Sequence, residues 1–200
     1  KAILADQAQV MILVPEIALT PQLLERFQQR TGASMVVLHS GLSERQRALA
    51  WQQAAQGLVQ VVVGTRSAVF TPMPNLGLII VDEEHDSSFK QQEGFRYSAR
   101  DMAVSRAQKK NCPVVLGSAT PAFESLYNVQ RQAYQTAKLT LRAGGAQLPA
   151  MELIDIRSVR LDAGISPVTR RLIAEELQQG HQVMVFLNRR GFAPVLSCHD

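Results

Sequence analysis

The chain has 200 residues, of which 46% are hydrophobic and 19% are charged, and its formal net charge is +4. This length suffices for one full domain and part of a second, and the composition is that of an ordinary globular protein. No apolar run approaches the roughly 18 residues of a membrane span, and two cysteines imply no disulfide framework. We therefore expect a protein of the reducing cytoplasm, whose mild basicity permits a polyanionic partner without demonstrating one.

Continuous apolar runs recur along the first 120 residues, and each is followed by small or polar residues. Apolar runs without alternation are typical of strands buried on both faces, as in a parallel sheet covered by helices. The predicted strands cover residues 10–14, 35–38, 59–63, 78–81 and 113–116.

Helical patterns with start signals lie between these runs, and their basic residues, among them Arg106, are expected to face solvent. Gly32 is expected to end the first of them. Strands and helices thus alternate, which predicts an α/β fold with a doubly wound parallel sheet. The predicted helices begin at Thr20-Pro21, Ser43, Ser98 and Thr120-Pro121.

A linker pattern rich in glycine interrupts this alternation. We expect residues 1–140 to form one lobe, residues 141–150 a linker, and residues 151–200 the beginning of a second lobe. In the second lobe the sequence predicts a helix from Ser166 to Gly180, and strands at 151–156 and 183–187. Residues 1–5 resemble the middle of a helix and the chain stops without a terminating element, so we expect a piece of a longer protein.

An acidic cluster directly follows the apolar run of residues 78–81: Asp82, Glu83 and Glu84, with His85 beside them. Open α/β sheets bind ligands at the carboxyl ends of their strands, where these side chains would lie. A carboxylate such as Asp82 suits Mg²⁺, and Glu83 could orient or deprotonate an attacking water. The alternative is a strand followed by an acidic turn in solvent.

Aromatic and basic residues are interleaved around Gly94, in a segment without clear periodicity. Such side chains suit stacking on bases and pairing with phosphates. The alternative is a surface loop that packs its aromatic side chains into the core. The residues concerned are Phe89, Lys90, Phe95, Arg96 and Tyr97.

Four polar loops follow four of the predicted strands, and their order and spacing resemble motifs Ia, Ib, II and III of superfamily 2 helicases. The Asp-Glu-x-His and Ser-Ala-Thr signals are specific when they occur together in this order. Longer runs are similar to the primosomal replication-restart helicases, and this similarity extends over essentially the whole chain. The runs are Val14–Gln22, His39–Gly41, Gly64–Ala68, Asp82–Gly94, Gly117–Pro121 and Phe186–Phe192.

This resemblance implies RecA-like lobes, each a parallel sheet with helices on both faces, and an ATP-dependent 3′→5′ DNA helicase that uses Mg²⁺. Such an enzyme would bind single-stranded and forked DNA at stalled forks. It would initiate replication restart by primosome assembly and reloading of the replicative helicase. The implied partners are primosome proteins, single-strand-binding protein and, indirectly, the replicative helicase and its loader, with no membrane.

The resemblance also implies roles for single residues. Asp82 would hold Mg²⁺ with ATP, Glu83 would position the hydrolytic water, and His85 would link the nucleotide site to motif III. Coupling residues would be Glu84, Gly117, Ser118, Ala119 and Thr120. DNA contacts would come from Glu16, Thr65, Arg66, Phe89, Lys90, Phe95, Arg96, Tyr97, Asn188, Arg189 and Arg190, and the aromatic loop among them would report DNA occupancy to the ATP site.

Two parts of a helicase motor are missing from these 200 residues. No G-x-x-x-x-G-K-[ST] phosphate loop occurs, and motifs V and VI with the arginine finger would lie beyond Asp200. We therefore expect the 200 residues alone not to hydrolyse ATP. By the same resemblance, Cys198 would begin a zinc-binding insertion, so Zn²⁺ would be a cofactor of the full-length protein, with its other ligands outside this chain.

Two other functions stay open from the sequence. A non-catalytic module with a helicase-like fold would recognise fork structure and recruit partners, and it would carry a degenerate nucleotide site. An RNA helicase of the same superfamily is disfavoured because the replication-restart motifs match over long runs.

Overall fold

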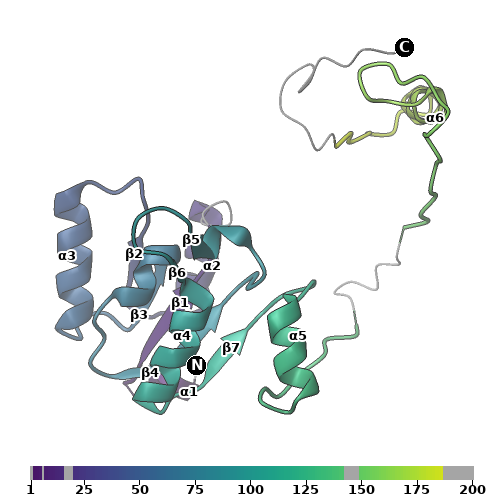
Figure 1. Cartoon of the computed structure of the whole chain (residues 1–200). Helices are drawn as coiled ribbons and strands as arrows, with labels where there is room; N and C mark the ends of the chain where they lie inside the picture. Colours follow the sequence, from purple (N-terminus) through teal and green to yellow (C-terminus); the bar gives the residue numbers. More distant parts are fainter. Residues whose placement is uncertain (1, 6, 16–19, 142–148, 187–200) are drawn as a thin grey trace. The chain divides into compact units, whose positions relative to one another are not determined.

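The computed structural model describes residues 2–5, 7–15, 20–141 and 149–186 (Figure 1). The chain divides into two compact units, residues 1–137 and residues 138–200. None of the helices in the described part of the chain has the length and apolar character needed to cross a bilayer.

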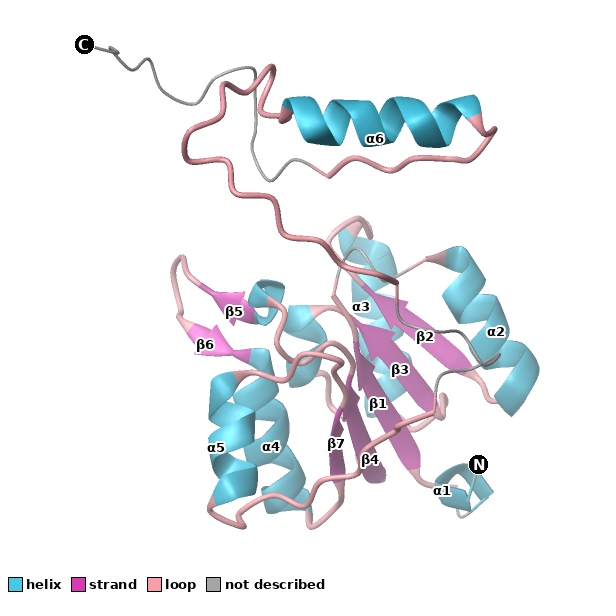
Figure 2. Ribbon diagram, turned by 90° about the vertical axis from the view of Figure 1, so that its right-hand side faces the viewer, coloured by secondary structure: helices cyan, strands magenta, loops and turns pink. Residues whose placement is uncertain are grey.

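The first unit is built on a sheet of five strands, all of them parallel. In space the strands follow the order β2-β3-β1-β4-β7, so β1 lies at the centre (Figure 2). Because every strand ends at the same edge, the loops that follow the strands lie together there. The strands are β1 (Gln9–Leu13), β2 (Met35–Leu38), β3 (Val61–Gly64), β4 (Leu76–Val81) and β7 (Val114–Leu116).

Helices cover both faces of this sheet. Neighbouring residues of a strand point to opposite faces, and the central strand shows the consequence. Met11 joins the core cluster that contains alanines of α3 and α4, whereas Ile12 joins the cluster that contains Leu24 and Phe27 of α2. The doubly wound α/β sheet predicted from the sequence is therefore confirmed. The helices of this unit are α1 (Ala2–Ala5), α2 (Pro21–Thr31), α3 (Glu44–Ala55), α4 (Ala99–Lys110) and α5 (Phe123–Gln130).

The predicted helix starts at Thr20, Ser43 and Ser98 are confirmed by their side-chain hydrogen bonds. Thr20 accepts from the Leu23 N–H at 3.3 Å, and Ser98 accepts from the Asp101 N–H at 3.3 Å. Ser43 forms the predicted capping box with the residue three positions later. These caps satisfy backbone donors that the first turn of a helix leaves free.

Helix α5 begins at Phe123, later than the predicted start at Thr120-Pro121. The residue at its N-cap position is Ala122, which has no side chain able to accept a hydrogen bond. The Glu84 carboxylate takes this role instead, since Ala122 N–H donates to its Oε1 at 2.7 Å. A contact from a residue 38 positions earlier thus sets where the helix begins, which local signals do not reveal.

A small antiparallel hairpin, β5 (Lys90–Gln91) and β6 (Tyr97–Ser98), lies between β4 and α4 in the chain. It is preceded by a 3₁₀ turn, η3 (Ser87–Phe89), and a second 3₁₀ turn, η2 (Arg66–Phe70), follows β3. The sequence predicted no regular structure for this segment.

The guanidinium of Arg106 does not face solvent, contrary to the prediction. It donates to the carbonyl oxygens of Val69 and Thr71 at 2.6 Å each, and so fastens α4 to the end of η2. Burial lowers the pKa of this guanidinium, because desolvation disfavours the charged form.

The second unit contains helix α6 (Pro167–Gln178), whose predicted N-cap, Ser166, accepts from the Thr169 N–H at 3.1 Å. The strands predicted at 151–156 and 183–187 are wrong for residues 151–156 and 183–186, which form no strand; residue 187 lies outside the described residues. A strand needs a neighbour to pair its backbone groups, and the described residues of this unit contain no sheet.

Candidate functional site

The polar segments predicted to carry chemistry meet at the carboxyl edge of the sheet. Asp82 follows β4, and its N–H donates to the carbonyl of Leu13 at the end of β1, at 2.9 Å. On the other side, Gly117 N–H donates to the carbonyl of Val81 at 2.8 Å. The sheet ladder thus continues into the loops and fixes their positions.

Asp82 and Glu83 form the acidic tip of β4. The Asp82 side chain is exposed, and its Oδ1 accepts from the Glu83 N–H at 3.1 Å. Glu83 adopts a left-handed backbone conformation, with φ of 47°, which is uncommon for a residue other than glycine. Such local strain persists only where the surroundings enforce it, and it occurs often at functional sites.

The tip of β4 fits the requirements of Mg²⁺ as substrate-bound cation. This ion needs one or two carboxylates, and waters and phosphate oxygens complete its shell. Asp82 can supply one such carboxylate, because its side chain reaches solvent. Among the described residues no cluster of three or more His, Cys, Asp or Glu side chains could hold a metal by itself.

His85 joins the loop after β4 to the loop after β7. Its Nδ1 lies 2.7 Å from the Ser118 Oγ, and its Nε2 lies 3.4 Å from the Thr120 Oγ1. The same Nδ1 lies 3.5 Å from the Glu83 carboxylate. One imidazole therefore contacts both the acid beside Asp82 and the Ser-Ala-Thr segment.

Glu84 points away from this edge and into the protein, where its side chain is 1% exposed. Its carboxylate accepts hydrogen bonds from Arg100 Nη1 at 3.2 Å and from Ser125 Oγ at 2.9 Å, in addition to the bond from Ala122 N–H. Its own N–H donates to the carbonyl of Gly117 at 3.0 Å. Arg100 was missed from the sequence, because nothing in its helix pattern marks it as buried.

Arg100 and Glu124 extend this cluster toward the hairpin. Burial lowers the pKa of Arg100, but hydrogen bonds and charge interactions with Asp101 and Glu84 outweigh it, so the net pKa is raised. The pKa of Glu124 is lowered, first by its own N–H and then by Arg100 and Lys90. Both groups are therefore charged at neutral pH.

The hairpin carries three of the predicted aromatic or basic DNA contacts on its surface. Phe95 is 77% exposed, and Lys90 and Arg96 are exposed as well. Tyr97 is half-buried and lies between two rings, with centroids at 4.9 Å for Phe70 and 6.0 Å for Phe95. The hairpin thus presents an aromatic cluster with cations beside it.

Phe89 is the exception among these residues. It is 1% exposed and belongs to the main core cluster, so its ring is closed to a base in this structure. The alternative left open by the sequence, an aromatic side chain packed into the core, holds for Phe89. The expectation that it contacts DNA is contradicted by this burial.

Arg66 supports the hairpin from the end of β3. Its Nη1 donates to the carbonyls of Ser88 and Lys90, both at 3.2 Å. Thr65 before it is held by a hydrogen bond from its N–H to the carbonyl of Leu38 at 3.0 Å. Thr65 and Arg66 are both half-buried, and they connect the ends of β2 and β3 with the aromatic hairpin.

A cleft of about 420 Å³ lies at this junction. It brings together three of the predicted DNA contacts, Thr65, Arg66 and Tyr97, and no acidic side chain is among the described residues that line it. Trp51 also lines this cleft and is 37% exposed. The full lining is Leu38, His39, Ser40, Arg47, Trp51, Thr65, Arg66, Ser67, Ala68, Ser88, Gln91 and Tyr97.

Five predicted site residues lie outside the described residues: Glu16, Asn188, Arg189, Arg190 and Cys198. The roles expected for them stay predictions.

Two curated proteins illustrate the similarity along this chain. It is 50% identical to the replication restart protein PriA of Haemophilus influenzae over 199 residues, which are 99% of this chain and 27% of that protein. It is 41% identical to the replication restart protein PriA of Bacillus subtilis, over 99% of this chain and 25% of the relative. The chain therefore spans about a quarter of the length of these relatives.

Solved structures give only a distant likeness. The helicase domain of Pyrococcus furiosus Hef matches with a TM-score of 0.39 and 12% identity, over 65% of this chain and 26% of that chain. The C-terminal domain of the DEAD-box protein Dbp5 matches with a TM-score of 0.43 and 15% identity, over 63% and 70%.

A family model described as DEAD/DEAH box helicase matches residues 1–129, which include the whole five-stranded sheet. The match covers more than half of the chain and agrees with the RecA-like α/β architecture. It also includes the acidic tip of β4 and the Ser-Ala-Thr segment that His85 connects. The chain belongs to the DEAD/DEAH box helicase family.

Proposed function

We propose that this chain is part of an ATP-dependent 3′→5′ DNA helicase that recognises stalled or branched replication forks and initiates replication restart. The observation that carries the proposal is the pair Asp82 and Glu83 at the tip of β4, joined through His85 to Ser118 and Thr120. The acids that suit Mg²⁺ and an attacking water are thus connected through His85 to the loop after β7.

In the proposed reaction each residue at the tip has one task. Asp82 would hold Mg²⁺, which would supply positive charge beside the phosphates of ATP. Glu83 would orient the water that attacks the γ-phosphate and accept its proton, while the bond from that phosphate to the leaving ADP breaks. His85 would hold Glu83 and Ser118 in fixed relative positions, so a change at the nucleotide site would be passed to the loop after β7.

The cleft beside the hairpin is the proposed path of single-stranded DNA. Arg47 and Arg66 supply positive charge, and Trp51 and Tyr97 supply ring faces on which bases can stack. The exposed ring of Phe95 and the cations Lys90 and Arg96 would extend this surface along the hairpin. Phosphate contacts of this kind make binding strongly dependent on salt.

The wider roles are proposed from the relatives, which are replication restart proteins. The partners would be primosome proteins, single-strand-binding protein and, indirectly, the replicative helicase with its loader. A protein with this task would act in the cytoplasm. A phosphate loop and an arginine finger would come from the remaining length of the protein, as would ligands that bind Zn²⁺ together with Cys198.

The proposed lobes are residues 1–140 and residues 151–200, joined by residues 141–150. Leu153 and Met184 are 98% and 93% exposed in the second unit. Large apolar side chains left in water fit a lobe that is completed by further chain.

The variant Glu83→Gln in the full-length protein tests the proposal. The amide has nearly the same shape but cannot accept a proton, so DNA-stimulated ATP turnover should be lost, by about a hundredfold or more. Binding of single-stranded DNA, measured by fluorescence anisotropy, should stay within about twofold, because Glu83 is not in the cleft.

Glu25→Gln is the matched control, since Glu25 is an exposed glutamate on α2 that does not line the cleft, and its loss should change neither quantity. Wild-type turnover in Glu83→Gln would refute the role of Glu83. A wild-type protein that binds forked DNA but never hydrolyses ATP would favour the non-catalytic module.

A further inference from the structure

Behind the acidic tip lies a buried pair, Glu84 and Arg100, that the proposed chemistry does not use. As whole residues, Arg100 is 6% exposed and Glu84 is 3% exposed, although both are charged residue types that proteins rarely bury. Burial of two charges is costly, and it is tolerated only when hydrogen bonds satisfy both partners. A pair kept at this cost is a candidate for a role beyond stability.

We propose that Arg100 is a positioning residue for ATP hydrolysis. It holds the Glu84 carboxylate, which connects the loops after β4 and β7, and it links this connection to the aromatic hairpin. The inference rests on the proposed function, because it names the residue that keeps Asp82 and Glu83 in place beside the Ser-Ala-Thr segment.

The hydrogen bonds of Glu84 connect the two loops. Its N–H donates to the carbonyl of Gly117, and its two carboxylate oxygens accept from Ala122 N–H and from Ser125 Oγ. These partners lie before, at and after the start of α5. Glu84, which directly follows Glu83, therefore fixes the segment from Gly117 to Ser125 against the end of β4.

Arg100 holds the carboxylate in this arrangement. Its Nη1 donates to Glu84 Oε2 at 3.2 Å, and its Nε donates to Asp101 Oδ1 at 2.9 Å. A planar guanidinium serves both acids at once, which the single ammonium of lysine cannot do with the same geometry. Without Arg100, Glu84 would keep a buried charge with one partner fewer, and it would tend to change its position.

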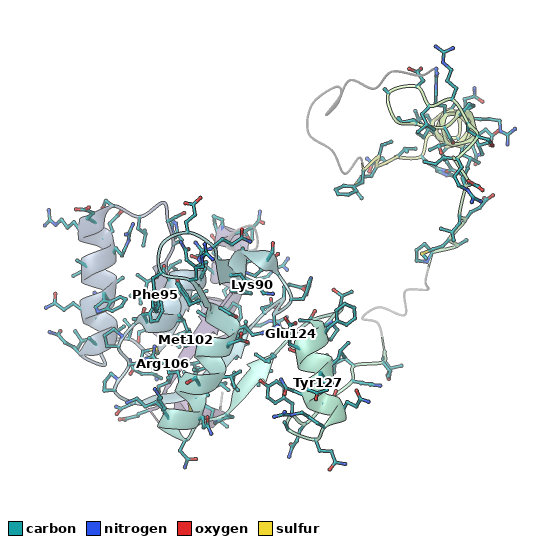
Figure 3. The ribbon with its side chains drawn as sticks, viewed as in Figure 1. Lys90, Phe95, Met102, Arg106, Glu124 and Tyr127 are labelled. Carbon is teal, nitrogen blue, oxygen red and sulfur yellow. The ribbon has the colours of Figure 1, made fainter. Side chains whose placement is uncertain are left out.

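The link to the hairpin runs through Glu124 of α5. Its carboxylate lies 3.7 Å from Arg100 Nη1 and 3.7 Å from Lys90 Nζ, the second residue being on β5. Figure 3 shows Lys90 and Glu124 facing one another from the hairpin and from α5. A hairpin that moves on binding DNA would draw Lys90 away from Glu124 and change the charge next to Arg100.

The surroundings leave room for such a change. A cavity of about 320 Å³ adjoins Arg100, and its lining also includes Lys90, Glu124 and Tyr134. The Lys90 and Glu124 side chains are 56% and 57% exposed, so their pairing is weak and easily rearranged, in contrast to the buried pair behind them.

The variant Arg100→Lys in the full-length protein tests whether Arg100 positions Glu84. We expect kcat for ATP at saturating DNA to fall about tenfold or more, the effect of losing one charge-assisted hydrogen bond. KM for ATP and Kd for single-stranded DNA should change by less than about twofold, because Arg100 contacts neither ligand. Lys109→Gln, an exposed position on the same helix, is the control and should behave as wild type.

Amide hydrogen exchange provides a readout that does not depend on activity. The Ala122 N–H donates to Glu84, so its exchange should become about tenfold faster in Arg100→Lys and stay unchanged in Lys109→Gln. Glu124→Gln tests the link, because it removes the charge that lies between Lys90 Nζ and Arg100 Nη1. It should reduce the stimulation by DNA about threefold and lower basal ATP turnover by less, consistent with a weak exposed pair.

Wild-type kcat together with wild-type Ala122 exchange in Arg100→Lys would overturn the inference, while the proposed function would stand on the turnover of the wild-type protein. A wild-type protein without turnover would defeat the proposed function and the hydrolytic role of Arg100 with it. Equal loss of basal and DNA-stimulated turnover in Glu124→Gln would overturn the link to the hairpin.

Discussion

Phe89 directly precedes the first strand of the hairpin and Phe95 lies in its turn, yet their surroundings are opposite. Phe89 is buried in the core and Phe95 is 77% exposed. Their residue types and spacing did not distinguish them, because an aromatic ring in an irregular segment serves equally for packing or for stacking on a base. What separates them is the 3₁₀ turn at Ser87–Phe89, which directs Phe89 inward.

This difference predicts two distinct phenotypes. Phe95→Ala in the full-length protein should weaken the stimulation of ATP turnover by DNA more than basal turnover, because it removes a stacking surface worth about 1–3 kcal/mol per base. Phe89→Ala should instead lower the free energy of unfolding by about 3–5 kcal/mol, the usual effect of emptying a buried aromatic site. Turnover assays and denaturant melts distinguish them, and a melt of Phe95→Ala unlike wild type would contradict the account.

Asp86 gives a prediction about pH. Its Oδ1 accepts from the Ser88 N–H at 2.7 Å, and hydrogen bonds from Ser88 lower the pKa of Asp86 below its ordinary value of 3.8. A carboxyl whose pKa is lowered by folding stabilises the fold above its ordinary pKa, and this contribution is lost as the pH falls through the lowered value.

The variant Asp86→Asn should therefore be less stable than wild type at neutral pH, and the gap in the free energy of unfolding should narrow as the pH falls below the ordinary pKa of 3.8. Denaturant titrations at several pH values measure this gap. A gap that stays constant down to strongly acidic pH would mean that the Asp86 carboxylate contributes nothing through its charge.

Among the structural elements, the end of β3 leaves the least room. A Cβ at Gly64 would lie 2.5 Å from the Cβ of Ala68 and 2.7 Å from the carbonyl oxygen of Leu38. Gly64→Ala should therefore displace Thr65 and Arg66 and destabilise the fold by about 1–3 kcal/mol, as overpacking does. DNA binding should weaken as well, because both displaced residues line the cleft.

Gly117→Ala is the comparison, because a Cβ there meets its nearest neighbour, Asp82 Oδ1, at an ordinary 3.5 Å. Thermal melts of the two variants should differ clearly, with Gly64→Ala the less stable. Equal melting temperatures would show that β3 and η2 can shift apart without cost.

Much of the first unit could be predicted from the sequence. Strands and helix caps of the first unit followed from local signals: an apolar run marks a strand buried on both faces, and Ser43 with Gln46 marks a helix start. His85 and the Ser-Ala-Thr segment could be paired in advance only by their resemblance to helicase motifs. Their contact spans 33 positions in the chain.

Features that depend on distant contacts were not predicted. Glu84 is buried because Arg100, Ala122 and Ser125 converge on it, and no local pattern encodes that meeting. The same contact delays the start of α5. The strand expected at residues 151–156 has apolar residues in the right number, but a strand also requires a neighbour, which local sequence cannot supply.

At the scale of the whole molecule, the first unit is a five-stranded parallel sheet with an acidic tip, a histidine contact to the next loop and a cationic, aromatic cleft along one edge. The chain spans about a quarter of the length of its curated relatives, so the motor we propose belongs to the longer protein. The 200 residues by themselves contain no G-x-x-x-x-G-K-[ST] run, and we predict that alone they bind DNA weakly and do not turn over ATP.

The most direct test of this account is steady-state ATP turnover by the full-length protein without nucleic acid, with single-stranded DNA and with single-stranded RNA of the same sequence. The account predicts slow basal turnover and stimulation of about tenfold or more by DNA, with much less by RNA. Turnover that ignores DNA, or that RNA stimulates equally, would contradict the proposal that the cleft beside the hairpin couples DNA to Asp82 and Glu83.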